Sequence, residues 1–412
     1  MSLPHVARNG AGFTIVELLF SMAIMLGITG VIFSLVDPAR GTYQTQPEIS
    51  DMQQRLRVGT AFLRDDLLMA GAGSLAGGNL TGTLMNFFAP VQPVLLGGAN
   101  SDPLNGVFYR DNAISVFYIP PTSPQTTIAQ VMPQPSAELK IGRDISCPDA
   151  KPLCNWKAGM RVLVFDNEGA FDIMTITHVQ PGSGGGPPVE GMLQHNKRIA
   201  GNELSKKYDV GAQVAQVAQR TYYWDPATRQ LRYFDGADQD EAVIDDVVDV
   251  QFTYFAEPRP PVVLSEDDRT TSYGPKPPLL TTRHKGGGNN ANSAWPAGEN
   301  CVFRVNPLNP NTRIARIPDL APGSQALVPL TEGMLTDGPW CPDVTFPTRF
   351  DADLLRVRKV GVRMRVQVAS AHLRGPAGVL FRQAGNSTSS RRLVPDQELQ
   401  FEISPRNFNL AR

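Results

Sequence analysis

A run of 24 residues, Phe13 to Val36, is mostly apolar and carries a single charged side chain, Glu17. As an α-helix this run would be about 36 Å long, which is enough to cross a lipid bilayer with some tilt. A carboxylate on a helix of this kind is costly in hydrocarbon and is typical of a functional position. The chain is therefore expected to consist of one apolar helix followed by a soluble remainder.

A short polar leader, which contains Arg8, precedes the apolar run. An ordinary secretory signal has its small-residue cleavage site after the apolar stretch, but residues 34–38 (Ser-Leu-Val-Asp-Pro) offer no A-x-A-like site. The small residues Gly10, Ala11 and Gly12 stand before the stretch instead. Cleavage there would remove the leader and keep the hydrophobic helix.

The octapeptide from Gly12 to Leu19, GFTIVELL, resembles the processing site of type IV prepilins and of type II secretion pseudopilins. The resemblance implies that a prepilin peptidase cuts after Gly12 and that Phe13 becomes the methylated N-terminal residue. It also implies that Glu17, at position five of the mature chain, takes part in assembly.

The segment from Asp51 to Gly71 is similar to PilW-type minor pilins and to the related J-type pseudopilins. One departure from the family pattern is visible. Many major pilins carry a proline near position 22 of the mature chain, where this sequence has Ser34, and the nearest proline is Pro38. Any kink of the family type would be displaced.

A physical reason supports an assembly role for Glu17. After cleavage Phe13 carries a free amine, and Glu17 of one subunit could pair with the Phe13 amine of the next. This would satisfy two charges that would otherwise be isolated in an apolar filament core. The alternative is a plain signal anchor that tolerates one polar residue.

Length and composition set the limits for the remainder. The chain has 412 residues and a net charge of −1, so no overall charge attracts it to nucleic acid or acidic lipid. Its apolar fraction of 42% can support a real core. We expect a leader (1–12), a transmembrane or filament-core helix (13–36), an amphipathic continuation (37–70) and a headgroup (71–412) with an insertion at about 258–347.

The helix is expected to continue beyond the apolar run, because apolar or small residues recur at three- and four-residue spacing. These residues are Ile49, Met52, Leu56, Thr60, Leu63, Leu67 and Ala70. Asp51, Arg55, Arg64 and Asp65 fall elsewhere on the helix surface. Pro38 and Pro47 each remove a backbone donor, so we expect a bend or break between them. The glycine-rich sequence from Gly71 to Gly73 is expected to end the helix.

Beyond the helix the pattern changes to that of strands, and residues 248–254 and 360–368 alternate with period two, which indicates strands with one buried face. Strands are expected at 113–119, 161–165, 171–176, 222–224, 231–234, 248–254 and 360–368. The turns at 166–169 and 225–228 are expected to join the strands on either side of them into hairpins. One long helix followed by antiparallel strands is an α+β arrangement. The resemblance implies a type IV pilin-like headgroup, in which the helix packs its apolar stripe on the sheet.

Two stretches are typical of loops. Gly71 to Asn105 connects the helix to the strands, and Pro258 to Pro347 is rich in proline, glycine and asparagine. A structureless loop of the second length is unusual in a compact domain, so this insertion is expected to carry some structure of its own.

The four cysteines fall into two local groups, Cys147 with Cys154 and Cys301 with Cys341. Four cysteines allow three pairings, of which the local one is favoured. Disulfides persist outside the cytoplasm, where the headgroup is expected to lie. The spacing does not favour zinc, because there is no C-x-x-C and no histidine close to either pair.

Other motifs give weaker signals. The acidic residues Asp235, Asp238, Asp240 and Glu241 could bind calcium, but a solvated turn is the simpler interpretation. The basic residues Arg356, Arg358, Lys359, Arg363 and Arg365 could touch DNA, but a solvated, ion-paired strand face is again simpler. The sequence predicts neither an enzyme nor a requirement for a cofactor or metal.

Two hypotheses for function follow. The first is a structural minor pilin that takes part in initiating a type IV pilus, or the related type II secretion pseudopilin. Its partners would be other minor and major pilins, prepilin peptidase and the inner membrane, and after assembly it would lie in the pilus at the cell surface. The second is a tip adhesin or DNA-binding module with a surface ligand.

Overall fold

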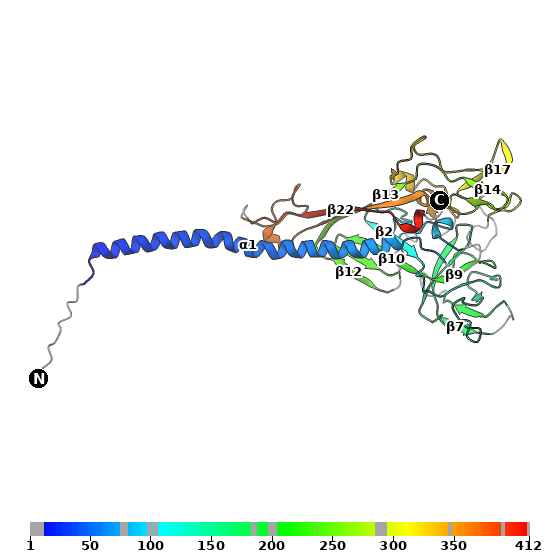
Figure 1. The fold of residues 1–412 in the computed structure, drawn as a ribbon, viewed down its shortest axis with the longest axis horizontal. Coiled ribbons are helices and arrows are strands. Elements are labelled where there is room, and N and C mark those ends of the chain that lie inside the picture. Colours follow the sequence, from blue (N-terminus) through cyan, green and yellow to red (C-terminus); the bar gives the residue numbers. More distant parts are fainter. Residues whose placement is uncertain are drawn as a thin grey trace. The chain divides into compact units, whose positions relative to one another are not determined.

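The structure is a computed structural model that describes residues 12–74, 81–96, 102, 106–182, 188–196, 204–236, 238–284, 295–344, 348–388 and 392–409. Apart from Gly12, the predicted leader lies outside these residues, as does the glycine-asparagine run 286–290. The described part is of mixed class, with one long N-terminal helix and many antiparallel sheets, in agreement with the α+β class expected from the sequence (Figure 1). The chain divides into two compact units, residues 1–54 with 367–396, and residues 55–366 with 397–412.

Helix α1 (Ile15–Met69) has 55 residues and continues through both prolines. The break expected between Pro38 and Pro47 was therefore wrong, because the backbone is helical at every position between them. A bend within the continuous helix stays a prediction. Each proline removes only one N–H donor from the ladder, and the hydrogen bonds of the neighbouring turns keep the helix together.

The predicted apolar stripe of α1 is confirmed by its burial. Met52, Leu56, Leu63, Leu67 and Ala70 are buried, and Ile49 and Thr60 are partly buried. On the same side of the helix, an added Cβ at Gly59 would lie 1.9 Å from Cδ1 of Ile244. Glycine at this position therefore lets Ile244 of strand β12 approach the helix backbone.

Helix α1 ends where the glycines predicted. Gly71 has φ +76°, a left-handed conformation that glycine adopts without steric cost. Its N–H donates to the carbonyl of Phe117 (3.0 Å), and its own carbonyl accepts from Leu84 (2.9 Å). Asn407 Nδ2 donates to the carbonyls of Met69 and Ala70, which are among the last of the helix. The helix end is thus hydrogen-bonded to a strand, to the start of a short 3₁₀ helix at Leu84 and to the C-terminal segment.

The strands form three larger antiparallel sheets and one smaller one. The first, in the order β1-β2-β10-β11-β12, comprises Val91–Gln92, Ala113–Tyr118, Ala218–Asp225, Gln230–Phe234 and Asp240–Ile244. The second, β18-β13-β21-β22, comprises Val328–Leu330, Val247–Ala256, Val357–Val366 and Gln397–Ile403. The third, β3-β9-β5-β6, comprises Gln125–Thr127, Gln213–Gln216, Arg161–Phe165 and Phe171–Thr175. The smaller sheet, β4-β8-β7, comprises Leu139–Ile141, Gly191–Gln194 and His178–Pro181.

Three hairpins and five short 3₁₀ helices complete the described elements. The hairpins pair β14 (Val263–Ser265) with β15 (Thr270–Thr271), β16 (Phe303–Asn306) with β17 (Asn309–Ala315), and β19 (Trp340–Cys341) with β20 (Phe350–Asp351). The 3₁₀ helices are η2 (Leu84–Asn86), η3 (Gly333–Leu335), η4 (Ala352–Arg356), η5 (Ala371–Leu373) and η6 (Arg406–Asn409). The range 258–347, expected to carry some structure, contains β14 to β19 and η3.

The alternating segments of the sequence are strands with the expected burial. Val248, Val250, Phe252 and Tyr254 of β13 are buried while the residues between them are partly exposed. The predicted hairpins are also present, because β5 pairs with β6 and β10 with β11, each antiparallel. Side-chain alternation was therefore a sufficient signal for β13, and the turns were a sufficient signal for the hairpins.

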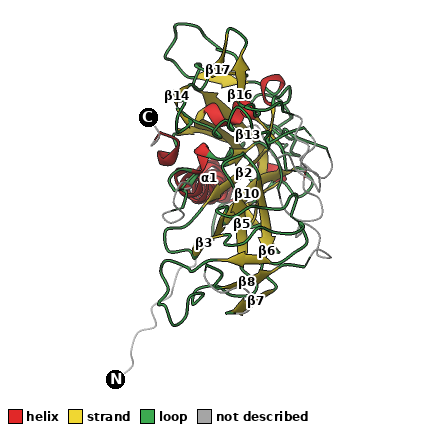
Figure 2. Ribbon diagram, turned by 90° about the vertical axis from the view of Figure 1, so that its right-hand side faces the viewer, coloured by secondary structure: helices red, strands yellow, loops and turns green. Residues whose placement is uncertain are grey.

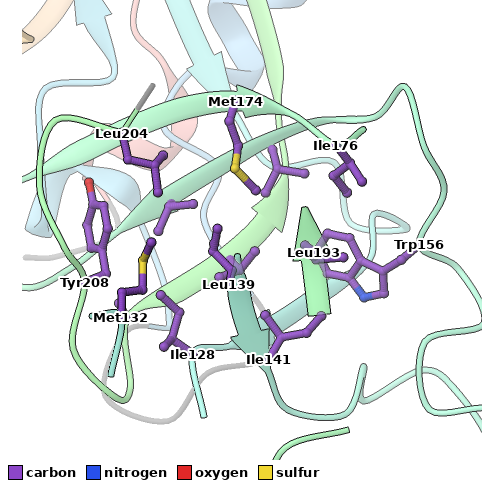
Figure 3. Close-up of a cluster of buried hydrophobic side chains, with 14 of the residues drawn as sticks. Ile128, Met132, Leu139, Ile141, Trp156, Met174, Ile176, Leu193, Leu204 and Tyr208 are labelled. Carbon is purple, nitrogen blue, oxygen red and sulfur yellow. The ribbon is translucent and has the colours of Figure 1, made fainter. Parts of the chain in front are cut away.

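Two groups of apolar side chains hold the sheets together. Phe88 stacks on Phe171 of β6 with ring centroids 4.6 Å apart, and it also meets Phe117 of β2 and Phe165 of β5. This cluster joins the first sheet to the third (Figure 2). A second core lies between the third sheet and β4-β8-β7 (Figure 3). It includes Ile128, Met132, Leu139, Ile141, Trp156, Met174, Ile176, Leu193, Leu204 and Tyr208.

In the compact unit that joins residues 1–54 with 367–396, the segment 367–396 folds back on itself around η5. Leu373, Phe381 and Val394 are buried, and the Val394 N–H donates to the carbonyl of Leu373 (2.8 Å). Arg374 Nη1 donates to the side chain of Gln367 (2.8 Å).

The cysteines form the two local pairs favoured from the sequence, Cys147–Cys154 and Cys301–Cys341. The first closes a short loop ahead of β5. The second joins the turn before β16 to strand β19, so it fixes the two ends of much of the insertion to each other.

Removal of the second disulfide is expected to cost more stability than removal of the first. The chain-entropy model gives roughly 2.5 kcal/mol for the Cys147–Cys154 loop and about 4 kcal/mol for the Cys301–Cys341 loop. The paired Cys→Ser variants are compared by urea unfolding of the detergent-solubilised chain, with non-reducing peptide mapping as the check on connectivity. Free thiols or crossed pairs in the unmodified chain would contradict the pairing.

Candidate functional site

The N-terminal end of α1 brings Thr14 and Glu17 together. The Glu17 N–H donates to Thr14 Oγ1 (3.3 Å), and Glu17 Oε2 accepts from the Thr14 N–H (3.5 Å) and hydroxyl (3.4 Å). This reciprocal pattern is a capping box, which satisfies donors at the start of a helix. The carboxylate also lies at the positive end of the helix dipole. Glu17 thus has a local structural partner within its own chain.

The predicted cleavage bond lies just ahead of the helix. Gly12, Phe13 and Thr14 are outside regular secondary structure, and the Phe13 side chain is 87% exposed. The bond between Gly12 and Phe13 is therefore not held in the helical hydrogen-bond ladder. The structure places Gly12, Phe13 and Glu17 within the first residues of one exposed segment.

The segment Ile15–Ser34 has the length and composition of a membrane span, and none of it is buried. Such a segment is equally consistent with a membrane anchor or a signal sequence. Its hydroxyl groups are satisfied within the helix: Ser21 donates to the carbonyl of Leu18, Thr29 to that of Met25, and Ser34 to that of Val31. The polar residues of the run therefore present no unsatisfied hydroxyl donor to an apolar surrounding.

Near its C-terminal end α1 presents Asp66 to the first sheet. Tyr118 of β2 donates its hydroxyl to Asp66 Oδ1 (2.9 Å), and Tyr222 of β10 donates to Oδ2 (2.6 Å). Arg220 Nε lies 3.8 Å from the same carboxylate. Sequence analysis missed Asp66, because its partners are 52 and 156 residues away in the chain.

Burial and charge keep the two tyrosine hydroxyls that bond to Asp66 protonated. Burial raises the pKa of both Tyr118 and Tyr222, and the negative charge of Asp66 raises it further. Both phenols therefore remain protonated and act as donors at any physiological pH. The Asp66 carboxylate is thereby held by two O–H groups and one guanidinium, which fixes how the helix lies on the sheet.

Helix residue Arg55 makes a second polar contact. Its Nη1 lies 3.1 Å from Asp246 Oδ2, and the Arg55 side chain is only 15% exposed. The expectation that Arg55 lies away from the packed face therefore needs correction, since its head group reaches the turn between β12 and β13. Asp246 itself has φ +55°, a conformation available to aspartate in turns.

A group of three carboxylates lies around β19 and β20. Ligand oxygens of Asp337, Asp351 and Asp353 are all within 4.8 Å of one another, so these residues could hold a metal ion. Asp351 caps η4 by accepting the Asp353 N–H (2.9 Å), and it also accepts the Gly338 N–H (2.7 Å). Arg356 Nε lies 3.0 Å from Asp353 Oδ1 and already supplies a positive charge.

The acidic residues singled out from the sequence are arranged differently. Asp240 pairs with Arg232 (2.8 Å), and Asp235 Oδ1 accepts the Gln239 N–H (3.2 Å). Within the described ranges, the only group of three potential metal ligands is the one around Asp351. The simple solvated turn is consistent with these contacts.

Ion pairs, as expected from the sequence, hold four of the basic residues in the β21 region, Arg356, Arg358, Lys359 and Arg363. Not all of these four are solvated. Arg356 and Arg358 are buried, and Arg358 pairs with Glu257 (3.4 Å). Lys359 pairs with Glu402 (2.6 Å) and Arg363 with Asp249 (3.0 Å). The expectation of a wholly solvated face was wrong for the first two, because the carbonyls of Pro258 and Pro318 and the carboxylate of Asp353 complete a buried site for Arg356.

Comparison with known proteins adds no relative: neither a family model, nor a curated protein, nor a solved structure matches the chain.

Replacement of Asp66 is expected to destabilise the protein strongly. Asp66→Ala leaves two buried phenol hydroxyls without an acceptor, which should lower the unfolding free energy by about 2–4 kcal/mol. Asp65→Ala, at the neighbouring exposed position, is the matched control and should change it little. Equal urea midpoints for the two variants would contradict the proposed role of Asp66.

The carboxylate group around Asp351 makes a pH-dependent contribution to stability. Burial raises the pKa of Asp351 to about 7 and of Asp353 to about 6, and the charge of Asp337 adds to both effects. Between about pH 4 and pH 7 these two carboxyl groups therefore bind more protons in the folded state than in the unfolded state. Their contribution to the unfolding free energy consequently declines as pH rises through this range.

Asp337→Asn removes a like charge and should lower both pKa values. The unfolding free energy of the variant should rise by less than about 1 kcal/mol at pH 8 and should not change at pH 4. The effect is small because Asp337 is exposed and its charge is screened by solvent. Unfolding midpoints across this pH range test the expectation, with the exposed Asp267→Asn as control. Identical pH profiles for the two variants would refute it.

Proposed function

We propose that the chain is a minor subunit of a type IV filament, PilW-like in character, which is cleaved after Gly12, methylated on Phe13 and assembled through its N-terminal helix. The observation that carries the proposal is the sequence Gly12–Leu19 at the head of a helix whose apolar run is exposed throughout. An ordinary soluble domain gains nothing from such a surface, whereas a filament core or a bilayer covers it.

Assembly would use the two groups at the helix start. Cleavage leaves Thr14 and Glu17 in place, so the capping box survives in the mature chain. The amine of Phe13 from a neighbouring subunit would then compete with the Thr14 hydroxyl for the Glu17 carboxylate. In an apolar surrounding an ammonium–carboxylate pair is stronger than a neutral hydroxyl contact, so the neighbour's amine would displace the hydroxyl.

Before assembly, the same helix would anchor the chain in the inner membrane with the headgroup in the periplasm. Two features support this location. The hydroxyls of the apolar run bond to their own helix, and two disulfides link the remainder of the chain, which is typical of an oxidising compartment. Prepilin peptidase and the other minor and major pilins would be the partners.

A position near the tip follows from size. The headgroup, from about Gly71 to Arg412, is large for a subunit that repeats along a shaft, because closely packed N-terminal helices would bring such headgroups into collision. At the tip no further subunit lies above, so a large headgroup has room there. A type II secretion pseudopilin is the alternative with the same helix, and a tip adhesin or DNA-binding module is the alternative with a further ligand.

Processing is tested by substitution at the cleavage position. Gly12→Val should abolish cutting, because a branched side chain does not fit a site suited to glycine, whereas Gly12→Ala should retain part of it. Mass spectrometry of the membrane-extracted chain reads out the N-terminal residue and its methylation. An intact Met1 leader on the unsubstituted chain from assembled filaments would refute the proposal.

The pairing role of Glu17 is tested separately from its capping role. Glu17→Ala should leave the chain in the membrane, because the apolar run is unchanged, but should strongly reduce its incorporation into filaments. Thr14→Ala removes the cap at a cost of about 0.5–2 kcal/mol to the helix start and keeps the carboxylate, so incorporation should persist.

Incorporation is measured by immunoblot of sheared filaments, and position by immunogold labelling. Normal incorporation of Glu17→Ala would count against the pairing role, and even labelling along the shaft would count against the tip.

A further inference from the structure

Lys206 is buried and faces two carboxylates. Its side chain is 5% exposed, and Nζ lies 2.5 Å from Asp166 Oδ2 and 3.3 Å from Glu168 Oε2. Its neighbours Leu204 and Tyr208 belong to the core between the third sheet and β4-β8-β7 (Figure 3). The ammonium group is therefore held at the edge of an apolar core, in contact with the turn between β5 and β6.

The same turn fixes the carboxyl group of Asp166. Asp166 Oδ1 accepts the main-chain N–H groups of Glu168 (2.9 Å) and Ala170 (3.3 Å), while Oδ2 is directed to Lys206. Two fixed N–H donors on one oxygen polarise the carboxyl carbon. They are also the arrangement that stabilises an oxyanion when a nucleophile attacks such a carbon.

We propose that Lys206 and Asp166 form an intramolecular isopeptide bond. Nζ of Lys206 attacks Cγ of Asp166, and the N–C bond forms as the bond from Cγ to Oδ2 breaks. The negative charge of the tetrahedral intermediate develops on Oδ1, between the two N–H donors. Oδ2 leaves as water, so one ammonium and one carboxylate give one amide and one water, and the reaction needs no oxidant, reductant or activating co-reactant.

Glu168 is the group that moves the protons. Burial lowers the pKa of Lys206, but the charges of Asp166 and Glu168 outweigh burial and raise it overall, so Lys206 starts as an ammonium. Glu168 accepts one proton from Nζ, which makes the amine nucleophilic, and passes it to Oδ2. Once the N–C bond has formed, Glu168 relays a second proton from Nζ to Oδ2. Oδ2 then carries two protons and leaves as water, while the third proton of the ammonium stays on the amide nitrogen.

Contact between the two groups within one fold favours the amide over separate acid and amine. His284, also buried, stays neutral because burial and then the charge of Lys206 lower its pKa to about 4, so it adds no competing positive charge. Amide formation from free acid and amine is unfavourable in dilute water. Groups held in contact within one fold reach effective concentrations of about 10⁵ M or more, which shifts that balance.

The bond would connect the β5–β6 turn to the segment that leads into β9. The two residues are 40 positions apart, and Asp172 of β6 already accepts the Ser205 N–H and hydroxyl and the Tyr208 hydroxyl. This segment is thus fixed on both sides of Lys206 before any bond forms. The inference concerns the headgroup and is independent of the proposed cleavage and assembly.

The test is the mass of peptides from the purified full-length chain after reduction of its disulfides. The unsubstituted chain should yield a branched peptide that joins Lys206 to Asp166 and is one water lighter than its two parts. Asp166→Asn should give the same branch with loss of ammonia instead. Complete recovery of Lys206 and Asp166 in separate linear peptides would overturn the proposal and leave a buried ion pair.

Two substitutions test the assigned roles. Lys206→Arg keeps the positive charge but should abolish the branch, whereas Lys207→Arg, at the adjacent exposed position, should retain it fully. Glu168→Gln should reduce branch formation at least tenfold in samples shown to be folded by their circular dichroism. Unchanged branching in Glu168→Gln would overturn the role of Glu168, and a branch surviving in Lys206→Arg would overturn the assignment of the nucleophile.

Discussion

An apolar helix surface must be covered, and α1 has two regions that meet this requirement differently. Its stripe from Met52 to Ala70 is buried within the chain. Its run from Ile15 to Ser34 is exposed on every side. Each exposed large apolar side chain forgoes about 1.5–3 kcal/mol relative to burial, so the whole run cannot remain in water. The second region therefore calls for an apolar cover, and it has the length and composition of a membrane anchor or a signal sequence.

Polar contacts then determine how the covered region lies on the sheet. Apolar packing alone has little directional preference, but Asp66 must meet two hydroxyls, Arg55 must meet Asp246, and Gly59 must admit Ile244. A rotation of the helix by one residue would break all three contacts together. The first sheet is thus fixed to this part of the helix in one register.

Much of this could be predicted from the sequence, because the relevant signals are local. Alternation predicted β13 and β21, and apolar runs on either side of a turn predicted β5 and β6. Three- and four-residue spacing predicted the buried stripe, and proximity in the chain favoured the disulfide pairs. The Thr14–Glu17 capping box was also visible as a T-x-x-E pattern before an apolar run, but it was missed because Glu17 had been considered only for assembly.

The errors and omissions share a different origin. The break expected at the prolines was wrong because local propensity was weighed without the hydrogen bonds of the neighbouring turns. Arg356 and Arg358 looked like surface residues because their partners, Asp353 and Glu257, are recognisable only once the chain is folded. The same holds for Asp66, for the carboxylates around Asp351 and for the contact of Lys206 with Asp166, where the fold brings together side chains with no common local pattern.

The way α1 ends has a mechanical consequence. Gly71 and Asp66 bond to β2 and β10, which are inner strands of a five-stranded sheet and not its edges. Tension on the helix would therefore enter the sheet through its middle, where each strand is flanked by ladders on both sides. From β2 the load would pass through Phe117 and Phe88 to the third sheet. A pull on the helix would thus be shared among many hydrogen bonds at once and would not peel one strand from an edge.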